Sequence, residues 1–208
     1  MSTPRQPRST PRSGAVAGAP WKRREKPVLV LPGFGASDLS TVPLRRQLRL
    51  LGHPVHGWQL GRNEGPTPDT IQGLGARVRE LTDRYDRPIA LVGWSLGGVY
   101  AWNIARRDPD RVRLVVTLGS PLGYTESESS PLPVPLTSIW SRNDRIVRWP
   151  SPVIEEGHRR ENIEVRATHL TLGFDPFVLA AIADRLVQRG DDWKPFRPPR
   201  WLDAAYPR

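Results

Sequence analysis

The sequence contains no cysteine and only one methionine in 208 residues. The absence of cysteine excludes disulfides, thiol catalysis and thiolate metal sites, although it leaves the cellular compartment open. No run of about 18 apolar residues occurs either, so we expect no membrane-spanning helix. At this length the chain is one domain with a substantial core.

Motifs for bound cofactors are also missing. No cluster of His, Asp and Glu has metal-ligand spacing, and no phosphate loop or dinucleotide fingerprint occurs. We therefore expect neither a metal site nor a cofactor.

The net charge of +10 is concentrated at the N-terminus. Residues 1–26 contain seven basic residues and one acidic residue, and residues 189–208 contain five and three. The body of the chain is therefore close to neutral, and we expect no specific binding of nucleic acid by the fold.

Residues 1–26 are rich in Pro, Ser, Thr, Gly and Arg, which predicts a disordered basic tail. Their apolar stretch at 15–17 is too short for a signal peptide, which favours a cytoplasmic location. An arm rich in arginine can contact anionic lipid, so membrane contact through the tail is one interpretation. A solvated leader is the other.

A Gly-x-Ser-x-Gly motif, GWSLG at 93–97, lies between an apolar run and a helical pattern. A serine in such a tight strand-to-helix turn needs neighbours almost without side chains, a need that Gly93 and Gly97 meet. Gly98 would let the following helix approach the sheet closely. The turn exposes the Ser95 hydroxyl beside the N–H groups of a helix start. An unreactive serine in a glycine-rich turn would leave the same motif.

With this motif the chain resembles the α/β-hydrolase family, and within it the minimal bacterial lipases and esterases that lack a lid. The resemblance covers residues 27–188 and implies an α/β fold with a mostly parallel sheet flanked by helices. The alternation of strand and helix patterns along the chain predicts the same class. In this family an oxyanion loop precedes the serine, and an acid and then a histidine follow it.

The apolar run at 28–31 leads into Pro32-Gly33-Phe34-Gly35, where the family commonly has His-Gly-x-Gly. The resemblance implies that the backbone N–H groups of Phe34 and Leu96 form the oxyanion hole. Pro32 stands where the family often has histidine, a departure that does not affect a backbone donor. A plain glycine-rich turn is the alternative.

For the acid, the resemblance implies Asp144, which follows the predicted strand 136–140 at the family's S-x-x-D-x-x-V spacing. An aspartate in a polar loop can also be a turn former. Glu126, Glu128 and Asp175 are weaker candidates.

For the base, the resemblance implies His169, which lies just after the predicted strand 162–165. His158 also follows the serine but lies in a charged, solvated run. His53 and His56 precede the serine, so we expect structural or surface roles for them. Trp94, beside the serine, is a candidate for substrate contact or for packing.

Three parts are expected: the basic tail 1–26, a hydrolase domain at 27–190, and an extended tail at 191–208 that is rich in proline and aromatics. The stretch 122–135 is too short for a substantial lid, so we expect a small lid or none. Helical periodicity predicts a helix over 37–51 with Leu44, Leu48 and Leu51 in the core. The caps at Thr67 and Asp175 predict the starts of two further helices.

The function implied is a serine hydrolase of the esterase or lipase kind, which cleaves carboxylic esters through an acyl-enzyme. The expected substrate is a small-molecule or lipid ester. The sequence specifies neither the acyl chain, nor the alcohol, nor the oligomeric state. An acyltransferase with the same three residues and a catalytically silent binding protein stay open as alternatives.

Overall fold

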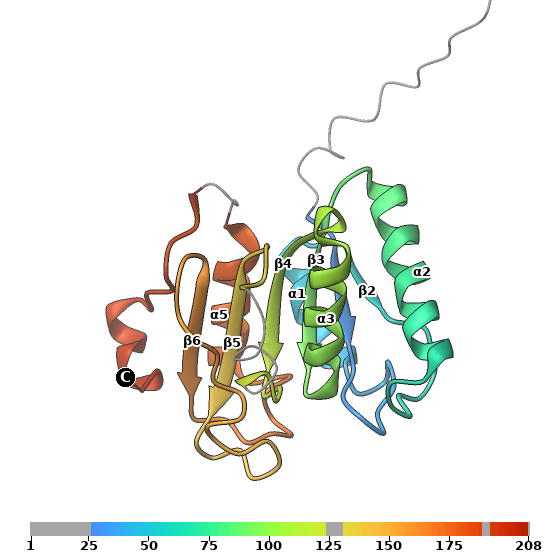
Figure 1. The fold of residues 1–208 in the computed structure, drawn as a ribbon. Coiled ribbons are helices and arrows are strands. Elements are labelled where there is room, and N and C mark those ends of the chain that lie inside the picture. The colour runs from blue at the N-terminus through green and yellow to red at the C-terminus, as the bar shows by residue number, and fades with distance from the viewer. Residues whose placement is uncertain (1–25, 124–130, 189–191, 208) are drawn as a thin grey trace, which may run out of the picture.

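The computed structural model describes residues 26–123, 131–188 and 192–207 (Figure 1). The predicted basic tail, apart from its last residue, lies outside these ranges, as do Glu126 and Glu128. In chain order the elements are β1 (Val28–Leu31), α1 (Val42–Leu50), β2 (Val55–Gly57), α2 (Pro68–Tyr85), β3 (Ile89–Trp94), α3 (Leu96–Arg107), η2 (Pro109–Arg111), β4 (Val112–Leu118), β5 (Leu136–Ser141), β6 (Arg160–Val165), α5 (Pro176–Val187) and η4 (Arg200–Ala205).

The six strands form one sheet in the order β2-β1-β3-β4-β5-β6, and every neighbouring pair is parallel. Helices α2 and α3 cover one face, and α1 and α5 cover the other (Figure 1). The central strands are continuous apolar runs because both of their faces are buried. The predicted α/β fold with a mostly parallel sheet is confirmed.

Alternate residues of β1, β3, β4 and β5 enter two separate hydrophobic clusters. In β1, Val28 and Val30 pack with α1 and α5, whereas Leu29 and Leu31 pack with α2 and α3. All four side chains have no exposed surface. The sheet is thus fixed on both faces, and its strand ends form a firm base for the loops that follow them.

Two helix starts agree with the caps read from the sequence. The Thr67 side chain accepts a hydrogen bond from the Thr70 N–H at 3.1 Å, and Asp175 accepts from two N–H groups at the start of α5. Across the described ranges, no helix combines the length and the apolar character that crossing a bilayer requires.

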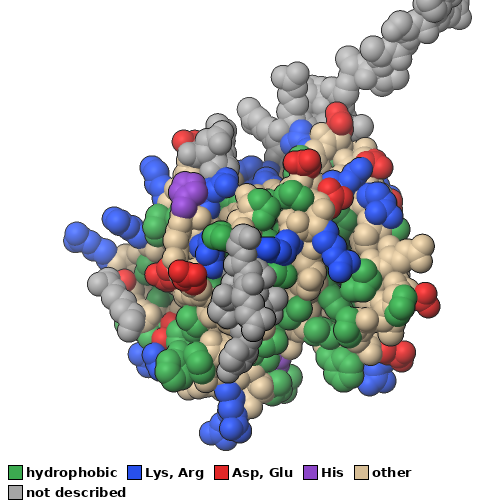
Figure 2. All heavy atoms as spheres, in the orientation of Figure 1, with side chains coloured by type: hydrophobic (Ala, Val, Ile, Leu, Met, Phe, Trp, Pro, Cys, Tyr) green, Lys and Arg blue, Asp and Glu red, His purple; other side chains and the backbone are tan. Residues whose placement is uncertain are grey.

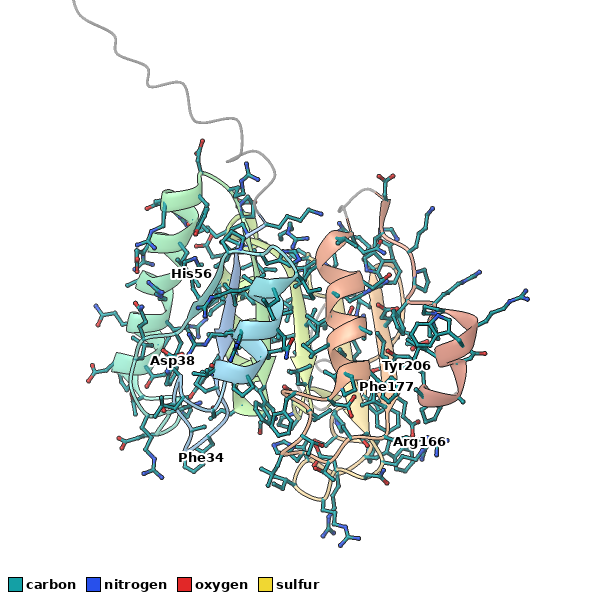
Figure 3. All side chains as sticks on the ribbon, turned by 180° about the vertical axis from the view of Figure 1, so that it is seen from behind. Phe34, Asp38, His56, Arg166, Phe177 and Tyr206 are labelled. Atoms are coloured by element: carbon teal, nitrogen blue, oxygen red, sulfur yellow. The ribbon has the colours of Figure 1, made fainter. Side chains whose placement is uncertain are left out.

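The predicted helix over 37–51 was too long, because α1 begins only at Val42. The residues before it form turns, in which the Asp38 carboxylate accepts the N–H groups of Trp58 and Gln59 at 3.0 Å (Figure 3). Leu51 was predicted to be in the core but is 54% exposed, because it caps the helix where the chain turns away at Gly52.

The expectation of a small or absent lid falls largely on residues 124–130, which lie outside the described part of the chain. The C-terminal stretch was expected to be extended. It includes the 3-10 helix η4, so that description is wrong for residues 200–205.

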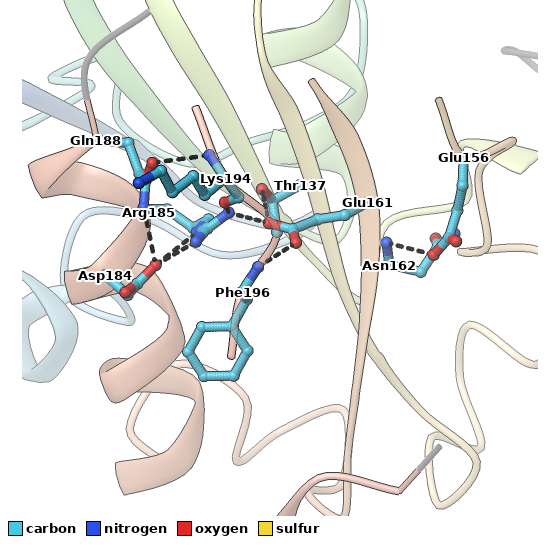
Figure 4. A network of polar contacts seen from close by, with 9 residues as sticks. All are labelled: Thr137, Glu156, Glu161, Asn162, Asp184, Arg185, Gln188, Lys194 and Phe196. Atoms are coloured by element: carbon cyan, nitrogen blue, oxygen red, sulfur yellow. Dashed lines mark hydrogen bonds and ion pairs between the residues drawn. The ribbon is translucent and has the colours of Figure 1, made fainter. Parts of the chain in front are cut away.

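The C-terminal stretch is attached to the sheet through a buried ion pair (Figure 4). Arg185 of α5 contacts the carboxylate of Glu161 on β6 and also donates to the Lys194 carbonyl at 2.9 Å. The second oxygen of Glu161 accepts the Phe196 N–H at 2.7 Å. Burial raises the pKa of the Glu161 carboxyl, and the Phe196 N–H and the charge of Arg185 oppose that rise. The pair therefore joins β6, α5 and the C-terminal stretch.

Replacing Arg185 with alanine should remove the charge partner of a carboxylate that is only 7% exposed. We expect Arg185→Ala to lower the free energy of unfolding by about 3 kcal/mol, measured by urea denaturation. Adding Glu161→Gln should recover part of this loss, because an amide still accepts the Phe196 N–H without a buried charge. Arg84→Ala removes an exposed pair with Glu80 and serves as the control, with a loss of about 0.5 kcal/mol. Equal losses in the two arginine variants would contradict this account.

Candidate functional site

Ser95 lies in the turn between β3 and α3 with φ 54° and ψ −122°, a left-handed conformation that is uncommon outside glycine. The turn is fixed on both sides, since the Ser95 N–H donates to the Leu118 carbonyl at 2.8 Å and its own carbonyl accepts the Gly98 N–H at 2.9 Å. The backbone strain is therefore supported by the neighbouring strand and the first turn of the helix.

The glycines of the motif are required by space. A side-chain carbon at Gly93 would lie 2.4 Å from the Gly97 carbonyl, and one at Gly97 would lie 2.3 Å from the carbonyl oxygen of Leu31. At Gly98 it would lie 2.0 Å from the hydroxyl of Ser120, so α3 does approach the sheet closely at this point.

Asp144 and His169 lie on the loops that follow β5 and β6. Both are buried, and His169 Nδ1 lies 2.6 Å from Asp144 Oδ2. The other carboxylate oxygen accepts the N–H groups of Ile146 and Val147, each at 2.8 Å. With the carboxylate held in this way, the contact favours the histidine tautomer with its proton on Nδ1 and leaves Nε2 as an acceptor.

The serine and the histidine line one pocket of about 300 Å³, which we call the serine pocket. Apolar side chains make up most of its wall, among them Phe34, Trp94 and Leu170. Gly119, at the end of β4, lies beside Asp144 and His169, because a side-chain carbon there would be 2.8 Å from Asp144 Oδ2 and 3.2 Å from His169 Nδ1. The structure thus brings the three residues predicted from the sequence to one place, while their catalytic roles stay a prediction.

Of the two predicted oxyanion residues, Phe34 lines the same pocket and Leu96 directly follows Ser95. A side-chain carbon on Gly33 would lie 3.2 Å from the Cβ of Ser95, so the loop after β1 runs directly beside the serine. Phe34 follows, with its ring 70% exposed at the end of the molecule to which the strands point (Figure 3). Leu96 is the first residue of α3, where N–H groups have no acceptor within the helix.

Asn63 holds the loop beside the serine, although no pattern in the sequence singles it out. Its side chain has no exposed surface, and its amide donates to the Pro32 carbonyl at 2.9 Å. The amide oxygen accepts the hydroxyl of Tyr100 at 3.0 Å and the N–H of Gly65 at 3.2 Å. The backbone of Asn63 also accepts the Gly35 N–H and donates to Ala36, both at 2.7 Å.

Asn63 therefore ties the loop at 32–36 to α3, the helix that begins after the serine. Locally it is one polar residue in the stretch GRNEG at 61–65, which reads as an ordinary loop. Only the folding of this loop back onto Pro32 gives it a role.

The weaker candidates have other environments. Asp175 caps α5. His56 Nε2 lies 2.9 Å from the Tyr85 hydroxyl on the far side of β1, and burial lowers the pKa of its imidazole to about 4. Burial also lowers the pKa of His53, and His158 is exposed. None of these four residues lines the serine pocket.

Trp94 has the packing role considered for it, and its contact with substrate stays a prediction. Its indole lines the serine pocket, and its Nε1–H donates to the His169 carbonyl at 3.0 Å. The ring also packs on Gly173, where a side-chain carbon would lie 2.4 Å from it. Trp94 thereby links the end of β3 to the loop that carries the histidine.

In the part of the chain that the structure covers, no group of three or more His, Cys, Asp or Glu residues is placed to hold a metal ion. The site is built from a serine, a histidine, a carboxylate and backbone N–H groups.

Residues 28–208 match the model of the alpha/beta hydrolase family. The comparison with curated proteins finds no significant match.

Solved structures with a similar fold include an esterase from Pyrococcus furiosus, with a TM-score of 0.61 and 18% identity over 78% of this chain and 82% of that one. A monoacylglycerol lipase from Paleococcus ferrophilus has a TM-score of 0.60 and 14% identity over 77% and 93%. Lipase B from Aspergillus fumigatus has a TM-score of 0.64 and 16% identity over 81% and 54%. At these identities the likeness concerns the fold alone.

Replacing Asn63 should loosen the loop beside the serine. Asn63→Ala leaves the buried Pro32 carbonyl and the Tyr100 hydroxyl without their partner, and we expect a loss of about 2–3 kcal/mol in unfolding free energy. Urea denaturation measures this loss. Asn103→Ala is the control and should cost less than about 1 kcal/mol, because among the described residues its amide bonds to the Val99 carbonyl one turn back on α3. A loss for Asn63→Ala no larger than the control would show that the amide is not structurally important.

Proposed function

Because the chain belongs to the alpha/beta hydrolase family, we propose that it is a serine hydrolase that cleaves carboxylic esters through an acyl-enzyme. The observation that carries this proposal is the 2.6 Å contact between buried Asp144 and His169, in a pocket shared with a serine at positive φ. Strained backbone and a buried acid–base pair are features that catalytic sites concentrate.

In the proposed reaction the Ser95 hydroxyl oxygen attacks the ester carbonyl carbon while His169 Nε2 takes the hydroxyl proton. The carbonyl π electrons move onto oxygen and form a tetrahedral oxyanion. When this species collapses, the C–O bond to the alcohol breaks and His169 gives its proton to the leaving oxygen. Water, deprotonated by the same nitrogen, then attacks the acyl carbon. The bond from this carbon to the Ser95 oxygen breaks, and His169 returns the proton to that oxygen as the acid leaves.

Asp144 has an orienting and electrostatic role in this scheme. One of its oxygens receives two backbone N–H groups, so only the other is directed at the imidazole. The carboxylate keeps the proton on Nδ1 and stabilises the imidazolium that forms when Nε2 is protonated. Because the pair is buried, water screens this interaction only weakly.

The oxyanion would accept the N–H groups of Phe34 and Leu96. The first belongs to the loop held by Asn63, and the second lies at the positive end of the α3 dipole. Donors that are fixed before the reaction stabilise the developing charge without reorganising. The anchoring of the loop supports this assignment.

The serine pocket is suited to binding an apolar acyl group. Its volume of about 300 Å³ and its apolar wall suit a short to medium acyl chain. Two of the solved proteins of similar fold are named an esterase and a monoacylglycerol lipase. Both names agree with the proposed cleavage of esters.

A fluorophosphonate probe tests the nucleophile. We expect one probe per protein, attached to Ser95, and no labelling of Ser95→Ala, by intact mass and peptide mapping. Hydrolysis of p-nitrophenyl butyrate by that variant should fall on the order of 10⁶-fold in kcat, because no other group forms the acyl-enzyme. Ser120→Ala, a buried serine next to α3, should still be labelled. An adduct on any residue other than Ser95 would disprove the assignment, and unlabelled protein without esterase activity would indicate a binding protein.

A double-mutant cycle tests whether Asp144 and His169 act as a unit. We expect His169→Ala to damage kcat almost as much as loss of the serine, and Asp144→Ala to damage it less. The double variant should then be little worse than His169→Ala alone, since the carboxylate acts only through the ring. If the increases in activation free energy of the two single variants simply added in the double variant, the 2.6 Å contact would have no catalytic role.

A further inference from the structure

A second hollow adjoins the serine pocket. It is lined by the loops after β5 and β6, with Arg142, Asn143, Arg145 and Thr168 in its wall, and we call it the arginine pocket. Its volume is about 670 Å³, and it opens to solvent. Ile146, His169 and Leu170 line both pockets, so the two hollows are adjacent and share the residue predicted as the base.

The two pockets differ in chemistry. Phe34 and Trp94 occur only in the serine pocket, whereas both arginines occur only in the arginine pocket. Figure 2 shows hydrophobic side chains along the lower end of the molecule, to which the strands point, with a basic side chain projecting beneath them. A molecule that fills both hollows would have an apolar part and a negatively charged part.

Arg142 is held in place and its charge is compensated. Its guanidinium lies 3.1 Å from the Glu164 carboxylate and 5.4 Å from the ring centres of both Trp140 and Trp149. It therefore gives the pocket a fixed wall.

Arg145 contributes the uncompensated charge. It is exposed, and none of the ion pairs among the described residues involves it. The neighbouring Asp144 is buried and fully engaged with His169 and two backbone N–H groups. The arginine pocket thus keeps a net positive charge one residue away from the acid.

The orientation of an ester follows from the roles of the two hollows. The acyl carbon must contact Ser95 and the oxyanion loop, both of which belong to the serine pocket. The leaving oxygen must receive its proton from His169, which also lines the arginine pocket. The alcohol part is therefore directed toward the arginines.

We propose that the protein prefers carboxylic esters whose alcohol part carries a carboxylate or phosphate, which Arg145 binds in the arginine pocket. The preference rests on the proposed function and concerns recognition only, since the anionic group takes no part in bond making or breaking. An arginine recognises either anion through paired N–H donors.

Two esters of equal size and different charge test the proposal. The butyrate esters of 4-hydroxybenzoate and 4-hydroxybenzamide carry the same acyl group, and only the first has a charged alcohol part. We expect Arg145→Gln to lower kcat/KM about 5-fold for the carboxylate ester, mainly through KM, because an exposed ion pair contributes modestly. For the amide ester, kcat/KM should change less than about 2-fold. About 0.5 M salt should reduce the preference of the unaltered protein by screening.

Arg148→Gln is the matched control, because Arg148 is exposed on the same loop but does not line the arginine pocket. This variant should leave the ratio of kcat/KM for the carboxylate ester to kcat/KM for the amide ester unchanged. If both arginine variants lowered this ratio equally, the effect would be one of general surface charge and the proposal would be overturned. A ratio that Arg145→Gln does not change would also overturn it.

A third arm separates an anionic substrate from an anionic surface. Both esters are assayed as dissolved monomers, and then the neutral amide ester with vesicles containing phosphatidylglycerol or only phosphatidylcholine. A preference for the charged ester in solution supports the proposal. An effect of Arg145 confined to phosphatidylglycerol vesicles would overturn it. Failure of the unaltered protein to hydrolyse either ester, together with no fluorophosphonate labelling, would refute the proposed function itself.

Discussion

The close packing of α3 against the ends of β1 and β3 is the constraint on which the site depends. At Gly97 the Leu31 carbonyl oxygen lies 2.3 Å from where a side-chain carbon would be, so the helix touches the strand backbone. A helix this close must begin directly after the strand, and Ser95 takes up the sharp change of direction at φ 54°. The packing of the helix on the strands therefore already requires the glycines of the motif, before any role in chemistry. The position of Ser95 in the wall of the serine pocket and the placing of Leu96 at the helix start both follow from it.

The other half of the site depends on strand register. β5 and β6 are parallel neighbours with Ser141 opposite Val165, so the loops that follow them start side by side. Asp144 lies three residues past the first of these ends and His169 four past the second, and short loops bring them to 2.6 Å. Carboxyl ends of parallel strands are where α/β sheets commonly place their sites, because several loops meet there without a long excursion of the chain.

Patterns read from the sequence predicted what depends on local geometry: the elbow glycines, the caps at Thr67 and Asp175, and the alternation that gives a parallel sheet. They missed what depends on contacts between distant segments. The Asn63 amide donates to the Pro32 carbonyl, 31 residues earlier in the sequence, and the residues next to Asn63 do not predict that contact. The prediction that Leu51 lies in the core was wrong for the same reason. The helical spacing of apolar residues continues to Leu51, but the chain leaves the helix there and turns at Gly52 with φ 88°. Periodicity records which residues are apolar, and tertiary context decides which of them are buried.

Burial divides the site into a fixed part and an adjustable part. Asp144 and His169 are 3% and 8% exposed, whereas the Phe34 and Leu170 side chains at the mouth are 70% and 66% exposed. Ile146 belongs to both parts. Its backbone N–H donates to Asp144 at 2.8 Å, while its side chain is 63% exposed and borders both pockets. A substitution at this position can reshape the mouth without removing the hydrogen bond that holds the carboxylate, because the main chain makes that bond. In the proposed hydrolase, substrate range can therefore change at exposed side chains whose own backbone keeps Asp144 in place, when the substitution preserves the backbone conformation.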